Sequence, residues 1–235
     1  MKTSNKLLLG ILLTMLILIA SVQLTVYAKF KRGEYAKFNR EQFHPMSTLE
    51  LPAVHFISAK GLGGCAVIPA DKLKVEIPKD SGPLKYQVVN DTLVIIGDST
   101  QTDDQLERGS RNNNLVNVYL PASVPLKGSY TSFKVSGTTD SVTAPSYTIG
   151  LYKNSYMFFD YKGPKSSSGY FNQVNVNSEQ STIDLNKHII LNDLKLQLSN
   201  NSRMNDNGGT ARKMAIDADN SSFINLSGKN IKALQ

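Results

Sequence analysis

The chain has 235 residues, with 26 Lys and Arg against 19 Asp and Glu, and so carries a formal net charge of +7. This length fits one domain or two, and 40% apolar with 19% charged residues excludes a disordered chain and a multi-pass membrane protein. The single Cys excludes a disulfide framework and a Cys-based zinc site.

The first element in chain order is an uncharged apolar segment, Leu7 to Ala28. As a helix it would extend about 33 Å, enough to cross a hydrocarbon core of about 30 Å. A cleaved signal peptide is the alternative, because Val26 and Ala28 place small residues at cleavage spacing. The apolar region of a signal peptide is usually about 7–15 residues, however, and this one is longer. We therefore expect an uncleaved anchor in contact with membrane lipid.

Basic residues flank this segment. The cluster after it begins with Lys29, Lys31 and Arg32, which we take as the membrane flank, and continues with Lys37 and Arg40. The positive-inside rule applied to these residues favours a cytoplasmic carboxyl side. The cluster would also contact anionic lipid headgroups, at about 1 kcal/mol for each cation. The expected organisation is a basic tail (1–6), the span (7–28), a juxtamembrane linker (29–49) and a β domain (50–235).

After the linker, apolar and polar residues alternate with a period of two, which is typical of strands. Gly, Pro, Asn and Asp separate the runs, and Asn90-Asp91 marks a turn between two of them. The polar stretch from Asp98 to Asn114 is the best candidate for a loop. No amphipathic helix of ten residues is expected after the span. The clearest strand-like runs are residues 73–77, 84–88, 93–96 and 115–120.

The carboxyl-terminal half contains a repeat with an offset of 20 residues. The segment from Leu194 to Met204 aligns with Met214 to Ile224, and a looser copy begins at Val174. Such self-similarity indicates a solenoid in which each coil buries its apolar side on its neighbours. Asn and Ser at the corners favour a parallel β-helix, because Asn tolerates left-handed turns. We expect an all-β fold, a parallel β-helix or solenoid-like domain preceded by one N-terminal transmembrane helix; an antiparallel sandwich is the alternative.

Several segments of the β domain resemble a known family. They are VEIPKDSGPLKYQVVNDTLVIIGD (75–98), LVNVYLPASVPLKGSYTSFKVSG (115–137), LQLSNNSRM (196–204) and IDADNSSFINLSG (216–228). With the N-terminal span, they resemble the auto-transporter adhesin head domains, also called the GIN domain family, over roughly residues 50 to 235. The resemblance implies a right-handed β-helix-like fold and an envelope location, and it supplies no catalytic residues.

The sequence shows no catalytic or metal-binding motif, and we expect no catalytic residue, cofactor or metal. The histidines His44, His55 and His188 are widely spaced, and none belongs to a zinc-binding motif. Cys65 is followed by apolar residues and is expected to be buried. Oxygen-rich turns at 205–209 and 217–220 match no calcium-loop spacing.

One aromatic-rich segment stands out, since eight of the chain's aromatic residues lie between Tyr147 and Phe171. Aromatic rings on a strand surface form stacking surfaces for sugar rings or docking patches for proteins. The alternative is that these rings fill the core where a sheet packs on the solenoid. The residues expected to contact a partner protein or glycan are Tyr152, Tyr156, Phe158, Tyr161 and Tyr170.

The distribution of charge bears on function. Through residue 44 the chain has seven basic residues and two acidic ones, whereas the remainder has 19 and 17. The β domain is therefore close to neutral, which removes the main argument for nucleic-acid binding. We expect a single-pass protein of the inner (cytoplasmic) membrane with a periplasmic or other extracytoplasmic domain. That domain would serve adhesion, scaffolding or binding without catalysis.

Three alternatives stay open. A polysaccharide-acting β-helix enzyme would need clustered carboxylates beside Lys or Arg. A cytoplasm-facing, membrane-tethered polymer of the bactofilin type would agree with the positive-inside rule. Cleavage near Ala28 would instead give a secreted protein.

Overall fold

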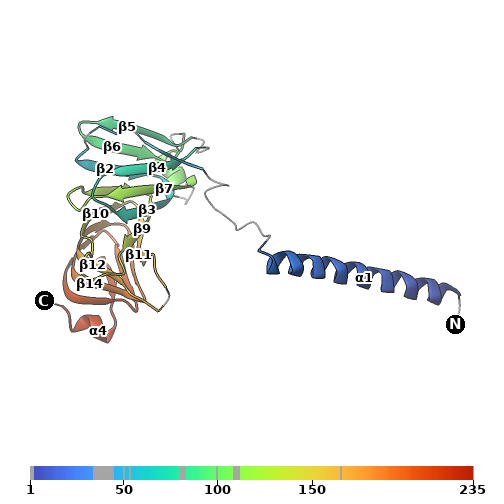
Figure 1. Cartoon of the computed structure of the whole chain (residues 1–235). Coiled ribbons are helices and arrows are strands. Elements are labelled where there is room, and N and C mark those ends of the chain that lie inside the picture. The colour runs from blue at the N-terminus through green and yellow to red at the C-terminus, as the bar shows by residue number, and fades with distance from the viewer. Residues whose placement is uncertain are drawn as a thin grey trace. The chain divides into compact units, whose positions relative to one another are not determined.

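The computed structural model describes residues 3–33, 45–49, 51–52, 54–79, 83–98, 100–107, 112–164 and 166–234. The chain divides into two compact units, Met1–Phe43 and His44–Gln235. In the described residues, the first unit contains one long helix and the second contains two β-sheets (Figure 1). Lys37, Arg40 and His44 lie outside the described residues.

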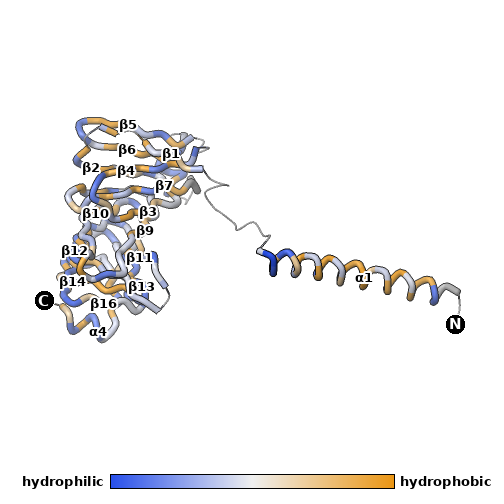
Figure 2. Tube along the Cα trace, in the orientation of Figure 1, coloured by the Kyte–Doolittle hydropathy of each residue, from blue (hydrophilic) through white to orange (hydrophobic). Residues whose placement is uncertain are grey.

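Helix α1 (Thr3–Lys31) is mostly hydrophobic along its length, with hydrophilic residues toward its two ends, as Figure 2 shows. Its large apolar side chains from Leu7 to Phe30 are exposed, and its most apolar window of 18 residues has a mean hydropathy of 2.6. The predicted apolar helix is confirmed. Its length and composition suffice to cross a membrane, and a signal sequence near the N-terminus would meet the same criterion. The Thr14 hydroxyl donates to the Gly10 carbonyl at 2.8 Å, so this polar group is satisfied within the helix, as lipid requires.

The second unit consists of two sheets, which we call sheet A and sheet B, with the apolar core drawn from both. From β8 onward the chain alternates between them, with even-numbered strands in sheet B and odd-numbered strands in sheet A. The described strands of sheet A are, in spatial order, β1 (Met46–Thr48), β4 (Lys74–Pro78), β7 (Asn112–Leu120), β3 (Leu62–Pro69), β9 (Ser132–Gly137), β11 (Tyr156–Tyr161), β13 (Thr182–Asn186), β15 (Arg203–Asn207) and β17 (Phe223–Asn225). Those of sheet B are β16 (Thr210–Ala218), β14 (Ile189–Ser199), β12 (Gly169–Glu179), β10 (Tyr147–Tyr152), β8 (Leu126–Ser129), β2 (Phe56–Lys60), β6 (Thr92–Ile96) and β5 (Lys85–Val89).

Each passage from sheet B to sheet A forms one coil of a β-solenoid, and neighbouring coils pair in parallel. The 20-residue repeat is confirmed in the register, since Leu194 pairs with Met214 and Met204 pairs with Ile224. The looser copy lies one coil earlier, where Val174 pairs with Leu194. Because the coils pair in parallel, the predicted solenoid is confirmed and the antiparallel sandwich is wrong.

The amino-terminal strands depart from this regular order. The pair β6 and β7 lies outside the pair β2 and β3, so the chain returns across β2 and β3 to begin the regular coils at β8. Strands β5 and β6 form an antiparallel hairpin whose turn residues, Asn90 and Asp91, have φ of 47° and 58°. Left-handed conformations at both central positions confirm the predicted turn and are typical of type I′ geometry.

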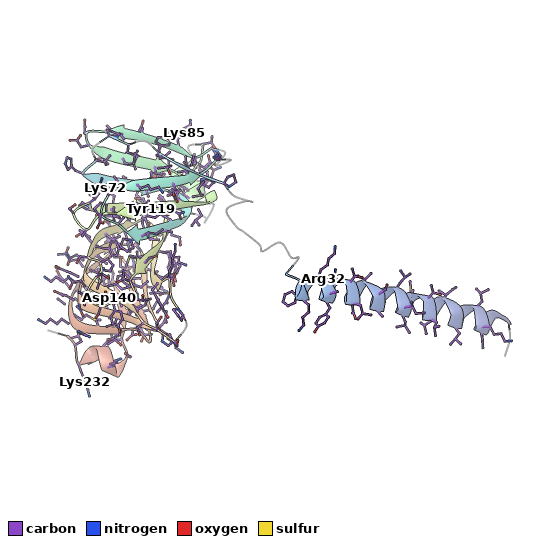
Figure 3. All side chains as sticks on the ribbon, viewed as in Figure 1. Arg32, Lys72, Lys85, Tyr119, Asp140 and Lys232 are labelled. Carbon is purple, nitrogen blue, oxygen red and sulfur yellow. The ribbon has the colours of Figure 1, made fainter. Side chains whose placement is uncertain are left out.

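Strand β5 is the outer edge of sheet B and is more exposed than its sequence indicates. The alternation of Leu84, Tyr86 and Val88 is typical of a strand with one buried face, yet only Leu84 is buried. Tyr86 is 47% and Val88 36% exposed, so no element among the described residues covers this face of β5. Figure 3 marks Lys85 on this strand. A lysine at an edge discourages pairing with other sheets.

A column of small hydroxyl residues forms a buried corner between the sheets. Thr131, Ser155, Ser181 and Ser202 occupy this corner in successive coils and are at most 4% exposed. The backbone N–H of Thr131 donates to Ser155 Oγ at 3.1 Å, and that of Ser155 donates to Ser181 Oγ at 3.2 Å. Asn201 precedes the last member with φ of 65°. The expected Asn and Ser corners are therefore confirmed at this edge.

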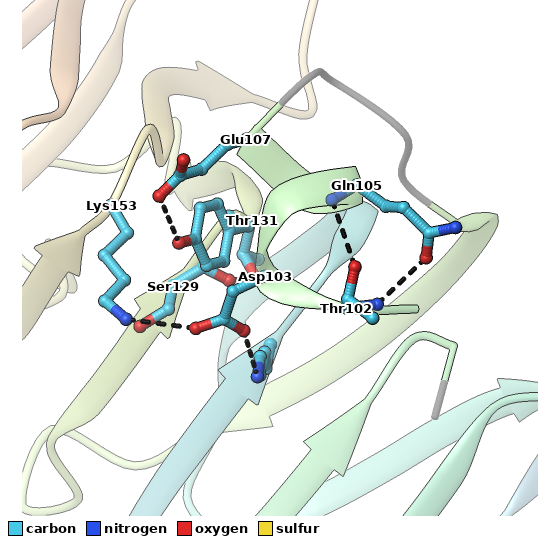
Figure 4. Close-up of polar contacts among 9 residues, drawn as sticks. Thr102, Asp103, Gln105, Glu107, Ser129, Thr131 and Lys153 are labelled. Atoms are coloured by element: carbon cyan, nitrogen blue, oxygen red, sulfur yellow. Dashed lines mark hydrogen bonds and ion pairs between the residues drawn. The ribbon is translucent and has the colours of Figure 1, made fainter. Parts of the chain in front are cut away.

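The stretch predicted as a loop, Asp98 to Asn114, contains the short helix α3 (Asp103–Glu107), and its end belongs to β7. Asp103 pairs with Lys60 at 2.7 Å and with Lys153 at 3.3 Å, which come from different coils (Figure 4). Leu106 of the same helix is buried. The loop prediction was wrong for this turn, because contacts with the solenoid, rather than helical periodicity, stabilise it. Residues 99 and 108–111 lie outside the described residues.

The short helix α4 (Gly228–Ile231) caps the carboxyl-terminal coil. The buried Asn230 side chain accepts the Ala211 N–H at 2.9 Å and donates to Asp206 Oδ2 at 2.6 Å. Ser227 Oγ donates to the same carboxylate oxygen at 2.6 Å. These bonds satisfy the Ala211 N–H and the Asp206 carboxylate on the outer side of the last coil, a side on which inner coils pair with a neighbouring coil.

Candidate functional site

Three aromatic side chains of the segment from Tyr147 to Phe171 fill the core. Tyr147, Phe159 and Phe171 are at most 2% exposed, and the rings of Phe159 and Phe171 meet edge to face with centroids 5.1 Å apart. The Tyr147 hydroxyl donates to the Ser136 carbonyl at 2.8 Å, and burial raises the pKa of Tyr147. The core interpretation therefore holds for these three residues.

Tyr156 and Phe158 lie on the outer face of sheet A with ring centroids 5.8 Å apart. Tyr156 Oη donates to Asp184 Oδ2 at 2.6 Å, and Asn205 Nδ2 donates to Asp184 Oδ1 at 2.8 Å. Partial burial and the bond to Asp184 raise the pKa of Tyr156 to about 12. This face therefore offers two neighbouring aromatic rings, but the carboxylate beside them is already bonded to both adjoining coils.

The other three residues predicted to contact a partner lie apart from that pair. Tyr161, at the end of β11, packs on the core, and its hydroxyl donates to the Ser167 carbonyl at 2.7 Å. Tyr170 is half-buried near the start of β12, and Tyr152 lines a groove on sheet B. The structure brings the pair on sheet A together, and it does not gather the five predicted residues into one patch.

Polar side chains elsewhere on the outer face of sheet A are bonded to one another. Lys134 pairs with Asp160 at 2.5 Å. Glu76 pairs with Lys74 at 2.6 Å and accepts a hydrogen bond from Asn117 at 3.2 Å. Desolvation raises the pKa of Glu76, but hydrogen bonds led by that from Lys74 outweigh it and leave the pKa below its ordinary value. Much of the hydrogen-bonding capacity of this face is therefore used within the protein.

Sheet B carries a shallow groove of about 420 Å³ on its outer face. Its lining comes from five adjacent strands, β2, β8, β10, β12 and β14. In the register, Gly150 of β10 stands between Lys127 of β8 and Asn177 of β12. Its polar lining includes Lys127, Thr148, Tyr152, Asn177, Lys195 and Gln197.

Because Gly150 has no side chain, the Tyr152 ring can lie over it on the outer face of sheet B. A Cβ at Gly150 would lie 2.8 Å from Tyr152 Cε2 and 3.2 Å from its Oη, so the ring extends over the glycine. Lys127 Nζ lies 5.2 Å from the centroid of the Phe56 ring, within cation–π range. Aromatic surface and an ammonium group are thus both present along the groove.

Of the groove residues, the sequence singled out Tyr152 alone. The repeat carries a signal for two more, because Asn177 and Gln197 stand 20 residues apart and pair in register on β12 and β14. The position of Asn177 beside Gly150 depends on the coil that contains β10, whose length differs from those that follow. Inspection of polar positions at the repeat spacing would therefore have found the amides but not the groove.

The predicted membrane flank lies at the carboxyl end of α1. Lys29 and Lys31 belong to its last turn, where the helix dipole favours positive charge. Lys31 Nζ lies 5.8 Å from the centroid of the Tyr27 ring. The backbone N–H of Arg32, marked in Figure 3, donates to the Ala28 carbonyl at 3.1 Å. Cations beside an aromatic ring at the end of an apolar helix are typical of a membrane–water interface.

Of the cysteine and histidines considered in the sequence, Cys65, His55 and His188 lie among the described residues. Cys65 is fully buried in β3, and burial raises the pKa of its thiol to about 12, so its expected burial is confirmed. His55 is exposed and lies 3.9 Å from Asp91, while His188 occupies a turn with φ of 63°. Within the described ranges, no group of three or more His, Cys, Asp and Glu is placed to hold a metal ion.

Comparison with protein-family models found no match, and comparison with curated proteins found none either. Among solved structures, the chain is similar to a candidate adhesin from Parabacteroides distasonis, at 12% identity and a TM-score of 0.49, covering 76% of this chain and 71% of that one. It is also similar to a candidate cell adhesion protein from Clostridium sporogenes, at 12% identity and a TM-score of 0.27, covering 75% of this chain and 100% of that one.

Proposed function

We propose that α1 anchors this protein in the cytoplasmic membrane and that its β-solenoid serves adhesion or scaffolding on the extracytoplasmic side, by binding and without catalysis. One observation carries the proposal: an exposed, predominantly apolar N-terminal helix is joined to a domain whose sheets have extended polar outer faces. The helix would supply attachment, and the outer faces would supply a binding surface.

The case for anchoring rests on the apolar area of α1. Its exposed side chains include Leu12, Leu16 and Ile19, each of which is more than half exposed. Burying one such side chain in hydrocarbon is favourable by about 1.5–3 kcal/mol, so the sum along the helix far exceeds the cost of its few polar groups. The charged flank would then lie at the headgroups.

The case for a binding surface rests on the solenoid repeat. Residues at one position of each coil form a row across the sheet, with about 4.8 Å between neighbours. One such row on sheet A joins Lys134, Phe158, Asp184, Asn205 and Asn225 in register. Rows of this kind match extended partners, which is how solenoid proteins use their faces.

The carboxylates on the outer face of sheet A support binding more than hydrolysis. Asp160, Asp184 and Glu76 each pair with or accept hydrogen bonds from neighbouring side chains. A glycosidase needs two carboxyl groups that flank a bound sugar about 5–9.5 Å apart. Among the described residues, the lining of the sheet B groove contains no Asp or Glu. These positions favour adhesion over the polysaccharide-acting enzyme.

Two reporters fused after residue 235 test the orientation. Alkaline phosphatase is active only outside the cytoplasm, and a suitable fluorescent protein is fluorescent only inside it. We expect active phosphatase and a dark fluorescent fusion, because large domains translocate largely regardless of flanking charge. A matched variant with Lys29, Lys31 and Arg32 changed to Gln should give the same pattern. A fluorescent fusion with inactive phosphatase would support the cytoplasm-facing polymer instead.

A further inference from the structure

We infer that the groove on sheet B binds a carboxylated saccharide chain, with its carboxylates at Lys127 and Lys195 and a sugar ring against Tyr152. This inference rests on the proposed binding function and names the ligand class for one of its faces. The groove crosses five adjacent strands, β2 to β14, so it extends about 19 Å at the usual strand spacing. That length and the volume of about 420 Å³ suit an oligosaccharide segment better than a single ring.

The first support is that most polar side chains of the groove have no partner among the described residues, although Asn175 accepts a hydrogen bond from Gln173 at 3.4 Å. Within the part of the chain that the structure describes, the side chains of Thr148, Asn177, Lys195 and Gln197 make no hydrogen bond or ion pair with other side chains or the backbone. The Tyr152 hydroxyl is likewise without a protein partner there. On sheet A, by contrast, Asp184 and Glu76 are bonded to their neighbours. A hydroxylated ligand in the groove could therefore form hydrogen bonds without breaking existing ones.

The second support is the sign of the charge. The groove lining contains two lysines and, among the described residues, no acid. Two acids lie near the lining: Glu179, at the end of β12, accepts a hydrogen bond from Asn200 at 2.9 Å, and Asp217 of β16 pairs in register with Gln197. The chain from residue 45 onward is close to neutral, with 19 basic and 17 acidic residues, so this local excess does not simply follow the domain's overall charge. Two ammonium groups without a carboxylate between them favour an anionic ligand.

The third support distinguishes a glycan from an acidic peptide. Strand β10, beneath the groove, is paired on both sides, with β8 and β12. Its main chain is therefore committed to the sheet, and a peptide could not add to it as a further strand. Recognition must come from side-chain amides, hydroxyls and ammonium groups, together with the Tyr152 ring over Gly150. Neighbouring sugar hydroxyls can pair with amides, and an aromatic ring supplies apolar contact for the sugar.

Calorimetric titration of the full chain in detergent solution tests the inference. The probes are hexagalacturonate and a hyaluronan hexasaccharide, with maltohexaose as the neutral sugar and hexa-aspartate as the acidic peptide. We expect at least one carboxylated sugar to bind about tenfold or more tightly than either comparison ligand. Failure of both acidic sugars to bind, equal binding of maltohexaose, or equal binding of hexa-aspartate would each overturn the inference.

Variants locate the binding. The double substitution Lys127→Gln with Lys195→Gln should weaken binding of the acidic sugar about tenfold. The matched control changes Lys72 and Lys213 to Gln, which removes the same charge from exposed positions outside the groove lining. Thermal unfolding confirms that both double variants remain folded. Equal affinities for the two double variants would overturn the groove assignment, while the fusion reporters would still test the anchoring and orientation separately.

A second variant tests the aromatic contact. Gly150→Ala places a Cβ against the Tyr152 ring and should displace it, because that Cβ would lie 2.8 Å from Cε2. We expect weaker binding of the acidic sugar by about threefold or more. Unchanged affinity for the acidic sugar would contradict the place given to Tyr152.

Discussion

Ser155 Oγ accepts the backbone N–H of Thr131 at 3.1 Å, across the boundary between two coils of the solenoid. The same hydroxyl donates to the Tyr152 carbonyl at 2.7 Å, and Ser155 is only 2% exposed. A buried N–H needs a partner, and at this corner the parallel sheets on either side do not supply one. The serine column is therefore the means by which the chain turns from sheet B to sheet A without leaving polar groups unpaired.

We expect Ser155→Ala to destabilise the fold by about 1–3 kcal/mol, because the buried Thr131 N–H would lose its acceptor. Urea unfolding monitored by circular dichroism measures the effect as a lower midpoint with an unchanged slope. The control is Ser123→Ala in an exposed turn, where the change should stay within about 0.5 kcal/mol. Equal midpoints for the two variants would contradict the role given to the serine column.

Gly128 is required by the ring of Phe133. A Cβ at Gly128 would overlap Cε2 and Cζ of Phe133, and both residues are buried. We expect Gly128→Ala to cost about 1–3 kcal/mol through overpacking. Combined with Phe133→Leu it should cost less than the sum of the two single changes. Gly228→Ala is the control, since no atom beyond its chain neighbours and its own helix backbone lies within 4 Å of the position that its Cβ would take. Strict additivity in unfolding experiments would rule out the steric explanation.

The two strands of the amino-terminal hairpin should differ in their sensitivity to substitution. Val88 on β5 pairs directly with Leu93 on β6, but Val88 is partly exposed and Leu93 is fully buried. Leu93→Ala should destabilise by about 2–5 kcal/mol, whereas Val88→Ala should cost less than about 1 kcal/mol. Chemical unfolding of both variants checks this. A large loss for Val88→Ala would show that β5 is covered in solution.

The turn carboxylate Asp219 should make the fold sensitive to acid. Hydrogen bonds from the Asn200 backbone N–H, and then from the hydroxyls of Ser222 and Ser221, lower the pKa of Asp219 to about 2. Since this lies below the ordinary Asp value of about 3.9, its stabilising contribution is present above about pH 4 and is lost as the pH falls toward 2. The wild-type chain should therefore lose more stability over this interval than Asp219→Asn. Equal losses in urea titrations at the two ends of the interval would contradict the assignment.

The fold was accessible to sequence reasoning where the repeat is regular. The offset that joins Leu194 to Met214 is the pairing register itself, because coils of equal length place equivalent residues opposite each other. The insertion of β2 and β3 between two later coils was not accessible, since no local pattern records which strand a coil will pair with. The exposure of Val88 could not be predicted either, because alternation indicates a strand but does not show whether another element covers its apolar face.

The candidate site was less accessible than the fold. The density of aromatic residues between Tyr147 and Phe171 drew attention to a segment whose rings divide among the core and both outer faces. Period-two alternation assigns side chains to opposite faces of a strand, but it does not say which sheet a later strand will join. The groove depends on one residue without a side chain, Gly150, flanked in space by residues from other coils. Gly150 and these residues come together only when the coils stack, so their proximity cannot be read from the sequence.

The intact mass of the protein in alkali-washed membranes tests membrane anchoring most directly. We predict the mass of the uncleaved 235-residue chain, retained in the membrane fraction. Retention should depend on α1, so a variant with Leu12 and Leu16 changed to Asp should appear in the wash, because charged groups in a spanning helix cost about 2.5–3.5 kcal/mol each. A species that begins after Ala28 and is recovered in the soluble fraction would contradict the anchor and show that the helix is a cleaved signal.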